Sequence, residues 1–173
     1  ASGAAILAYG KVRPRKGGLV EGHMGGLVEV EYRRIIPRSL GTRAISFDGK
    51  GTPRIANSLI IANNTEIPVT CSRDDFEISV NDQEVFDVPV VEFENDTDYD
   101  PVDNFRFKCL SGAMRGDRIK VTFHYDINGI PNVEAHDLKS GQMLAGERLP
   151  YEEPDLEQIS IRIRPRWVVF AVD

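Results

Sequence analysis

The sequence predicts a mainly β protein built as a sandwich or barrel, and three observations support this fold class. Candidate strands follow one another from about residue 28 to residue 164. Turn-forming Gly, Asn, Asp and Pro residues separate these strands at short intervals. No long amphipathic helix pattern appears over the same part of the chain. Many short strands joined by regular turns are typical of sandwiches and barrels.

The candidate strands have apolar residues at every second position or in an unbroken row. Pro89 lies inside one of them and predicts an edge strand or a β-bulge, because proline cannot donate a ladder hydrogen bond. The clearest hairpin alternates Val121, Phe123 and Tyr125 with polar residues before the turn pair Asn128-Gly129. The strands are predicted at residues 28–36, 43–47, 57–62, 68–72, 76–80, 84–93, 104–110, 118–127, 131–137 and 157–163.

Composition indicates one soluble globular domain. The 173 residues are 41% hydrophobic and 28% charged, and the formal net charge is −6. This acidic balance argues against a nucleic-acid partner, and no apolar run reaches the roughly 20 residues of a membrane span. Cys71 and Cys109 are expected to be free thiols in a cytoplasmic protein, although a single disulfide between them is possible.

The sequence offers no recognisable catalytic or metal-binding set. No Ser-His-Asp or Cys-His arrangement and no glycine-rich phosphate loop is visible, and the three histidines lie far apart. Asp96, Asp98 and Asp100 have the alternate spacing of a calcium loop. The run lacks the glycine and the closing glutamate of an EF-hand. We therefore expect residues 92–103 to form a solvated surface loop.

The amino-acid sequence of the hairpin carries more information than its alternating pattern. Residues 121–137 read Val-Thr-Phe-x-x-Asp-x-Asn-Gly-Ile-x-x-Val-x-Ala-x-Asp, which resembles the hairpin near the end of the substrate-binding sandwich in heat-shock-70 (DnaK) chaperones. Further segments resemble this family in the order that the family requires. They are Ala1-Ser2-Gly3-Ala4-Ala5-Ile6, Ile36-Pro37-Arg38-Ser39-Leu40-Gly41, Asn64-Thr65-Glu66-Ile67-Pro68, Leu110-Ser111-Gly112-Ala113 with Arg115-Gly116, and Lys139-Ser140-Gly141.

The resemblance implies a β-sandwich of the DnaK substrate-binding type at residues 35–164, with a short N-terminal helix, in a chain that is part of a longer protein. Residues 1–10 correspond to the last helix of the family's ATPase domain, and Gly10 is a plausible helix C-cap. Residues 11–34 correspond to the interdomain linker. Residues 165–173, an apolar run that ends in an acid, resemble the first strand of a following von Willebrand factor A domain.

Two departures from the family pattern bear on function. The family has an acidic, leucine-rich linker where this chain reads Val28-Glu29-Val30-Glu31-Tyr32-Arg33-Arg34, so the allosteric chemistry of the linker is in doubt. The family has a helical lid where residues 150–173 bring prolines and further strand patterns. We therefore expect a lidless relative of the family.

In the family, a substrate peptide lies extended in a groove of the sandwich, held by backbone hydrogen bonds and one apolar pocket. By position, Ile45 and Ser79 match the residues that arch over the peptide, and Phe86 and Val88 match the pocket walls. Phe86 stands where the family usually has a small β-branched residue, so it could fill the pocket; both wall residues could equally be core residues. The implied peptide-binding residues are Thr42, Ala44, Ile45, Phe76, Ile78, Ser79, Phe86 and Val88.

The resemblance implies a molecular chaperone module that holds unfolded or extended apolar polypeptide segments. ATP and Mg²⁺ would belong to the ATPase domain of the longer protein, so neither a cofactor nor catalysis is expected on this chain. That ATPase domain and co-chaperones are the other expected partners. Three alternatives stay open: a scaffold sandwich that has lost peptide binding, which Phe86 and the missing lid favour; an extracellular adhesion sandwich with calcium at residues 96–103; and a hydrolase without an identifiable site.

Overall fold

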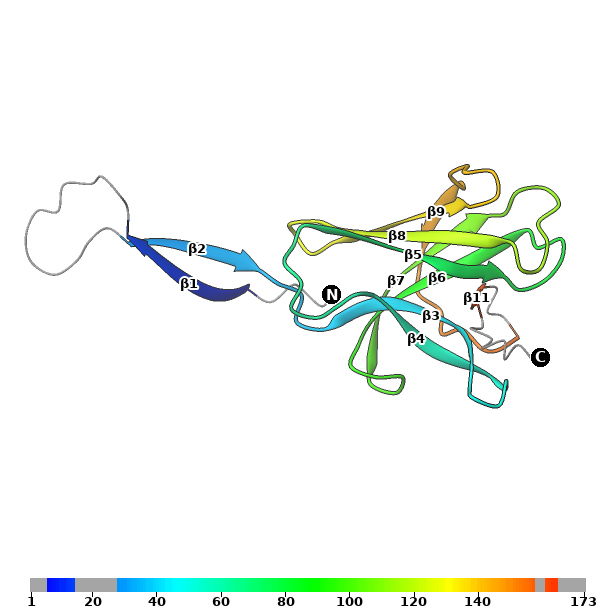
Figure 1. The fold of residues 1–173 in the computed structure, drawn as a ribbon, viewed down its shortest axis with the longest axis horizontal. Helices are drawn as coiled ribbons and strands as arrows, with labels where there is room; N and C mark the ends of the chain where they lie inside the picture. Colours follow the sequence, from blue (N-terminus) through cyan, green and yellow to red (C-terminus); the bar gives the residue numbers. More distant parts are fainter. Residues whose placement is uncertain (1–5, 15–27, 158–160, 165–173) are drawn as a thin grey trace, which may run out of the picture.

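The computed structural model describes residues 6–14, 28–157 and 161–164, and every regular element in these ranges is a β-strand (Figure 1). This confirms the mainly β fold class. The strands are β1 (Ile6–Pro14), β2 (Val28–Arg34), β3 (Ser39–Phe47), β4 (Pro53–Ile61), β5 (Val69–Ile78), β6 (Val85–Phe93), β7 (Tyr99–Lys108), β8 (Arg118–Tyr125), β9 (Pro131–Asp137), β10 (Gly146–Leu149) and β11 (Ile161–Ile163).

The expected N-terminal helix is wrong for residues 6–10, which belong to β1 instead. β1 pairs antiparallel with β2 in a separate two-stranded sheet, with Val12 opposite Val30. The physical reason is that a helix of about ten residues is marginal in water, whereas the alternating β2 sequence offers a backbone partner. Residues 1–5, 15–27 and 165–173 lie outside the described residues, so the assignments to an ATPase-domain end, a linker and a following domain stay predictions.

Strands β3 to β10 form two sheets that pack against each other. One contains β5, β8 and β9, and the other contains β4, β3, β6, β7 and β10. The core between them takes apolar side chains from both, including Leu40 and Val88 from one sheet and Phe76 and Phe123 from the other. β11 lies between β3 and β5 and joins the two sheets by hydrogen bonds.

The hairpin of β8 and β9 confirms the clearest sequence prediction. Val121, Phe123 and Tyr125 are buried, and they pair with a β9 strand whose Val133 and Ala135 are buried too. The loop between the strands is closed by Asp126, whose carbonyl accepts the amide of Gly129 at 3.0 Å. Gly129 has a φ of 75°, a conformation that glycine adopts without a steric penalty. The Asn-Gly pair therefore turns the chain as predicted.

Pro89 ends the contact between β6 and β3. β3 pairs with β6 only from Ser39 to Thr42, and Thr42 lies opposite Val90, one residue after the proline. Pro89 therefore lies on a part of β6 that β3 does not pair with, in agreement with the edge position predicted for it. The β6–β7 ladder changes register between Val90 and Val91, where β7 has the extra residue Val102. As a result, the second half of β3 has an edge that β6 does not cover. β11 occupies part of that edge.

The predicted strands 68–72 and 76–80 are one strand, β5, which is interrupted by a bulge. The register against β8 shifts between Arg73 and Phe76, and the Arg73 guanidinium binds the Asp75 carboxylate inside the bulge. After the bulge, β5 continues as Phe76-Glu77-Ile78 with three buried residues. This last part of β5 faces the uncovered edge of β3 across β11.

Candidate functional site

Two strand edges, Ile45 of β3 and Phe76–Ile78 of β5, lie on either side of β11, and we call the position between them the cleft. β11 pairs with both edges. It runs parallel to β3, with Arg162 opposite Ile45. It runs antiparallel to β5, with Ile161 opposite Ile78 and Ile163 opposite Phe76. The Arg164 amide extends the ladder by donating to the Asp75 carbonyl at 2.7 Å.

The side chains of β11 alternate between the core and the opposite face. Ile161 is fully buried in the core cluster, and Ile163 packs against that cluster. Arg162 points the other way, and its Nη2 lies 2.7 Å from Oε1 of Glu77. The side chains of this ion pair are only 14% and 7% exposed, respectively. Removing one partner of a buried ion pair typically costs about 3–5 kcal/mol, because the remaining charge has no counterpart.

The sequence-predicted peptide-binding residues divide into two groups in the structure. Six of them belong to β3, to β5 or to the residue that follows β5: Ile45 and Ser79 are half-buried, and the others are buried. Phe86 and Val88 of β6 are fully buried, and the Phe86 ring stacks on Phe107 with centroids 5.4 Å apart. The first group comprises Thr42, Ala44, Ile45, Phe76, Ile78 and Ser79. The ladders place Ile45, Phe76 and Ile78 against β11, whereas Thr42 lies opposite Val90 of β6.

Two of these residues carry polar atoms that the fold does not satisfy. Thr42 Oγ1 and Ser79 Oγ are buried without a hydrogen-bond partner among the described residues. Buried polar groups are usually paired. Both atoms belong to the two strands, or their immediate continuation, that flank the cleft.

Polar contacts among Arg43, Tyr99, Tyr151 and Glu153 hold the segment before β11 close to β3, and we call this group the brace. The Arg43 guanidinium is buried against the Tyr99 ring at 4.0 Å, and its Nε lies 3.1 Å from Glu153. The Tyr99 and Tyr151 hydroxyls donate to the same carboxylate at 2.7 and 2.8 Å. The hydrogen bond to Glu153 raises the pKa of Tyr99, and burial raises the pKa of Tyr151. These contacts fix residues 151–153 beside β3, ahead of β11.

The acidic run of the sequence is engaged by arginines. Asp96 lies 3.4 Å from Arg54, and Arg38 binds both Asp98 and Asp100. Asp96 also accepts the backbone amide of Asn57 at 2.9 Å. These contacts use the carboxylates that a calcium ion would need, and the described part of the chain contains no cluster of three or more metal-ligating side chains. They count against the calcium-dependent adhesion alternative.

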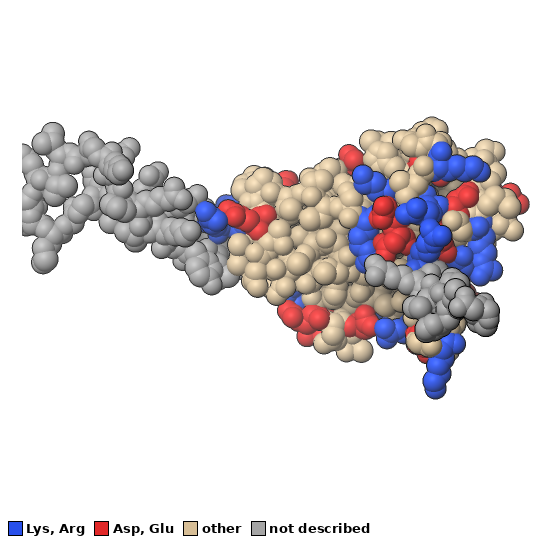
Figure 2. All heavy atoms as spheres, viewed as in Figure 1, with Lys and Arg blue, Asp and Glu red and all other residues tan. Residues whose placement is uncertain are grey.

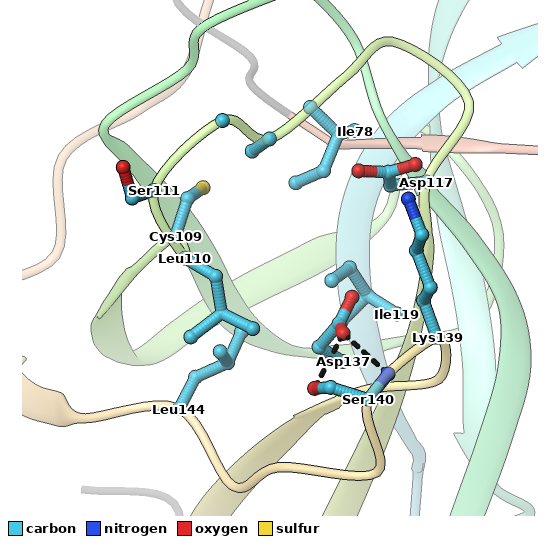
Figure 3. Close-up of a pocket in the computed structure, with 12 residues that line it drawn as sticks. Ile78, Cys109, Leu110, Ser111, Asp117, Ile119, Asp137, Lys139, Ser140 and Leu144 are labelled. Atoms are coloured by element: carbon cyan, nitrogen blue, oxygen red, sulfur yellow. Dashed lines mark hydrogen bonds between the residues drawn. The ribbon is translucent and has the colours of Figure 1, made fainter.

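A small pocket of about 260 Å³ opens between the loops at the end of β5, β7 and β9 (Figure 3). Cys109, Leu110 and Leu144 line one side, and Asp117 and Lys139 line the other. Cys109 and Cys71 are both free thiols. Burial raises the pKa of Cys109 to about 11, so this thiol is protonated at neutral pH and is a poor nucleophile.

The face shown in Figure 2 mixes acidic and basic side chains around the end of the sandwich that lies away from β1 and β2. A surface with both signs interspersed does not form the continuous basic footprint that nucleic-acid binding requires. In the described residues, no helix is long and apolar enough to span a membrane.

Sequence reasoning missed two features of the cleft. Glu77 belongs to the segment 76–79 that the resemblance places along the groove, but it was not among the predicted peptide-binding residues. Residues 157–163 were predicted to be a strand, but nothing indicated where that strand would dock. The available signal was the alternation Ile161-Arg162-Ile163, with a single basic residue that could have suggested an acidic partner.

Comparison with known proteins is consistent with this architecture. The family model described as "Hsp70 protein" matches residues 42–150. The Chaperone protein DnaK of Mycoplasmopsis synoviae (strain 53) is 30% identical over 128 residues, which cover 72% of this chain and 20% of the relative. The DnaK of Mycoplasmopsis pulmonis (strain UAB CTIP) is 30% identical over 130 residues, or 73% of this chain and 20% of the relative.

The chain therefore spans about a fifth of the length of these curated relatives. The family match covers most of the two sheets, from β3 to the segment after β10. Sequence resemblance, fold and family match agree on one conclusion: this chain belongs to the Hsp70 family.

Proposed function

We propose that this chain is a chaperone module that binds extended apolar polypeptide segments in the cleft between β3 and β5. The observation that carries the proposal is β11 itself, a short extended segment held in the cleft by backbone pairing on both sides. Backbone pairing at a sheet edge provides affinity that is independent of sequence, and side-chain pockets provide selectivity. This combination suits a protein that handles many different unfolded chains.

In the longer protein that we propose contains this module, an ATPase domain using ATP and Mg²⁺ would regulate binding, and the module would do no covalent chemistry. The relatives are named chaperones, which supports the same assignment. Co-chaperones and unfolded polypeptides would then be the partners of the whole protein.

A scaffold role is the second candidate, and one observation favours it. The Phe86 ring is stacked on Phe107 in the core, so it takes up space that a peptide pocket would need. In addition, β11 already occupies the cleft. A sandwich with a permanently filled cleft would link neighbouring domains without binding peptides.

Fluorescence anisotropy separates the two functions. A labelled leucine-rich peptide is titrated with the wild-type chain, with Ile45→Asp and with Leu59→Asp. Leu59 is a 45% exposed residue of β4 and provides the matched control. Peptide binding predicts a saturable signal that is lost in Ile45→Asp and kept in Leu59→Asp. A folded wild-type chain that gives no signal would support the scaffold role.

A further inference from the structure

β11 shows in detail what kind of segment the cleft accepts. Its three residues are held between a parallel neighbour on one side and an antiparallel neighbour on the other, so both the direction and the register of the bound strand are fixed. Two aliphatic side chains, Ile161 and Ile163, face the core, where Ile161 is completely buried. The residue between them faces away from the core and meets a charged group.

That charged group is Glu77, a carboxylate in an otherwise apolar end of β5. Glu77 lies between Phe76 and Ile78, and it is only 5% exposed. Its ladder neighbour on β8 is Arg118, but the Arg118 Nη2 instead donates to the Asp74 carbonyl at 3.1 Å. The ion pair of Glu77 within the described residues is the one with Arg162 at 2.7 Å. The cation therefore comes from the strand that occupies the cleft.

A buried carboxylate discriminates strongly between possible neighbours. A basic residue at the central position compensates its charge, an aliphatic residue leaves it without a counterpart, and an acidic residue repels it. The alternation of a strand places this central residue between two inward-facing positions. The cleft thus contacts three consecutive residues of a bound strand, two through apolar packing and the one between them through an ion pair.

We propose that Glu77 makes the cleft selective for extended segments with a basic residue between two aliphatic residues, and that β11 is an internal occupant with this pattern. The inference rests on the proposed peptide-binding function and specifies its substrate class. It further means that external peptides must displace β11. When an internal strand competes, the apparent affinity for a peptide equals the intrinsic affinity multiplied by the fraction of molecules whose cleft is open.

The test uses the full chain and three labelled peptides, Gly-Ser-Ile-Arg-Ile-Ser-Gly and its versions with Leu or Glu in place of the central Arg. Binding is measured by anisotropy for the wild-type chain and for Ile161→Asp, which is expected to release β11. Leu156→Asp is the matched control, because Leu156 is 48% exposed on the same C-terminal segment. We expect Ile161→Asp to bind the Arg peptide at least about tenfold more tightly than wild type, and Leu156→Asp to match wild type.

Selectivity is tested in the released background by adding Glu77→Gln, which keeps the size of the side chain and removes its charge. We expect Ile161→Asp to prefer the Arg peptide over the Glu peptide by at least about tenfold, and the double variant to lose most of that preference. If Ile161→Asp does not unfold cooperatively in urea, Arg162→Glu replaces it. That variant opposes two carboxylates at the same contact and leaves the core unchanged.

The outcomes distinguish this inference from the proposed function. Peptide binding that Ile45→Asp removes, but that Ile161→Asp does not strengthen, would overturn the internal-occupant claim and leave the chaperone function intact. An Arg preference that persists after Glu77→Gln would overturn the role of Glu77. The absence of binding by all folded variants would overturn the proposed function, and this inference with it.

Discussion

The two edges of β5 carry very different partners. On one edge, β8 pairs from Val69 to Glu77 and belongs to a hairpin with β9. On the other edge, β11 pairs only with Phe76–Ile78. β8 buries Ile119, Val121, Phe123 and Tyr125, whereas β11 fully buries only Ile161.

We infer from this difference that β8 is a structural partner of β5 and that β11 is an exchangeable one. Backbone pairing follows the same rules on both edges, so the stability of each partner depends mainly on the apolar area that it buries. A long hairpin strand with four buried apolar side chains cannot leave without unfolding the domain. A strand of three residues can leave while both sheets keep their other neighbours. This inference supports the proposal that the second edge is a binding site.

The largest expected difference between the two edges is in stability. Ile119 and Ile161 are both buried isoleucines beside the end of β5. We expect Ile119→Ala to lower the free energy of unfolding by about 3 kcal/mol, since it leaves a cavity in the permanent core. Ile161→Ala should cost only about 1 kcal/mol, because its loss cannot exceed the docking free energy of β11. Urea unfolding measures both values, and equal costs would mean that β11 is as permanent as β8.

The second expected difference is in hydrogen exchange. Amides of β8, such as that of Phe123, should exchange only through global unfolding. The Arg164 amide, which donates to Asp75 at 2.7 Å, should exchange through local release of β11, at least about a hundredfold faster. Exchange followed by NMR would show this difference directly. Similar protection of both amides would contradict an exchangeable strand.

The smallest expected effect concerns the brace that precedes β11. Burial raises the pKa of Tyr151 above its ordinary value of 10.0. The neutral hydroxyl is therefore favoured by folding, so its contribution to stability is complete below about pH 10 and is lost as the pH rises towards the folded pKa.

Tyr151→Phe removes this group together with its hydrogen bond to Glu153. At neutral pH we expect a loss of about 1 kcal/mol or less in the free energy of unfolding. Above about pH 10, the variant should lose stability less steeply than the wild-type chain. Urea unfolding from pH 8 to pH 11 measures both effects, and parallel curves would show that Tyr151 does not contribute to the alkaline decline.

The sequence could predict elements whose signals are local. The hairpin of β8 and β9 combines alternation with an Asn-Gly turn, and both act within a few residues. Pro89 predicted an interruption of strand pairing for the same reason. The N-terminal strand β1 could not be predicted, because its stability depends on β2, which begins fourteen residues after β1 ends. Small residues such as Ala4 and Ala5 suggested a helix in the absence of that partner.

The cleft was only partly predictable for a related reason. Ile45, Phe76 and Ile78 could be placed by their resemblance to family motifs. Glu77 and Arg162 are 85 positions apart in the sequence (162 minus 77), and each alone resembles an ordinary surface charge. Their pairing depends on the docking of β11, which follows from the edge of β3 beyond Thr42 that β6 leaves uncovered. Such a long-range consequence is not encoded in any local pattern.

The most direct test of a replaceable strand follows the Arg162 and Arg164 amide signals of the wild-type chain by NMR during titration with unlabelled Gly-Ser-Ile-Arg-Ile-Ser-Gly. If the peptide takes the place of β11, both signals should move to the positions of an unpaired segment, and they should do so with the same saturation as the signals of Ile45 and Ile78. Saturable binding that leaves the two arginine amides unchanged, or an absence of binding, would contradict this account.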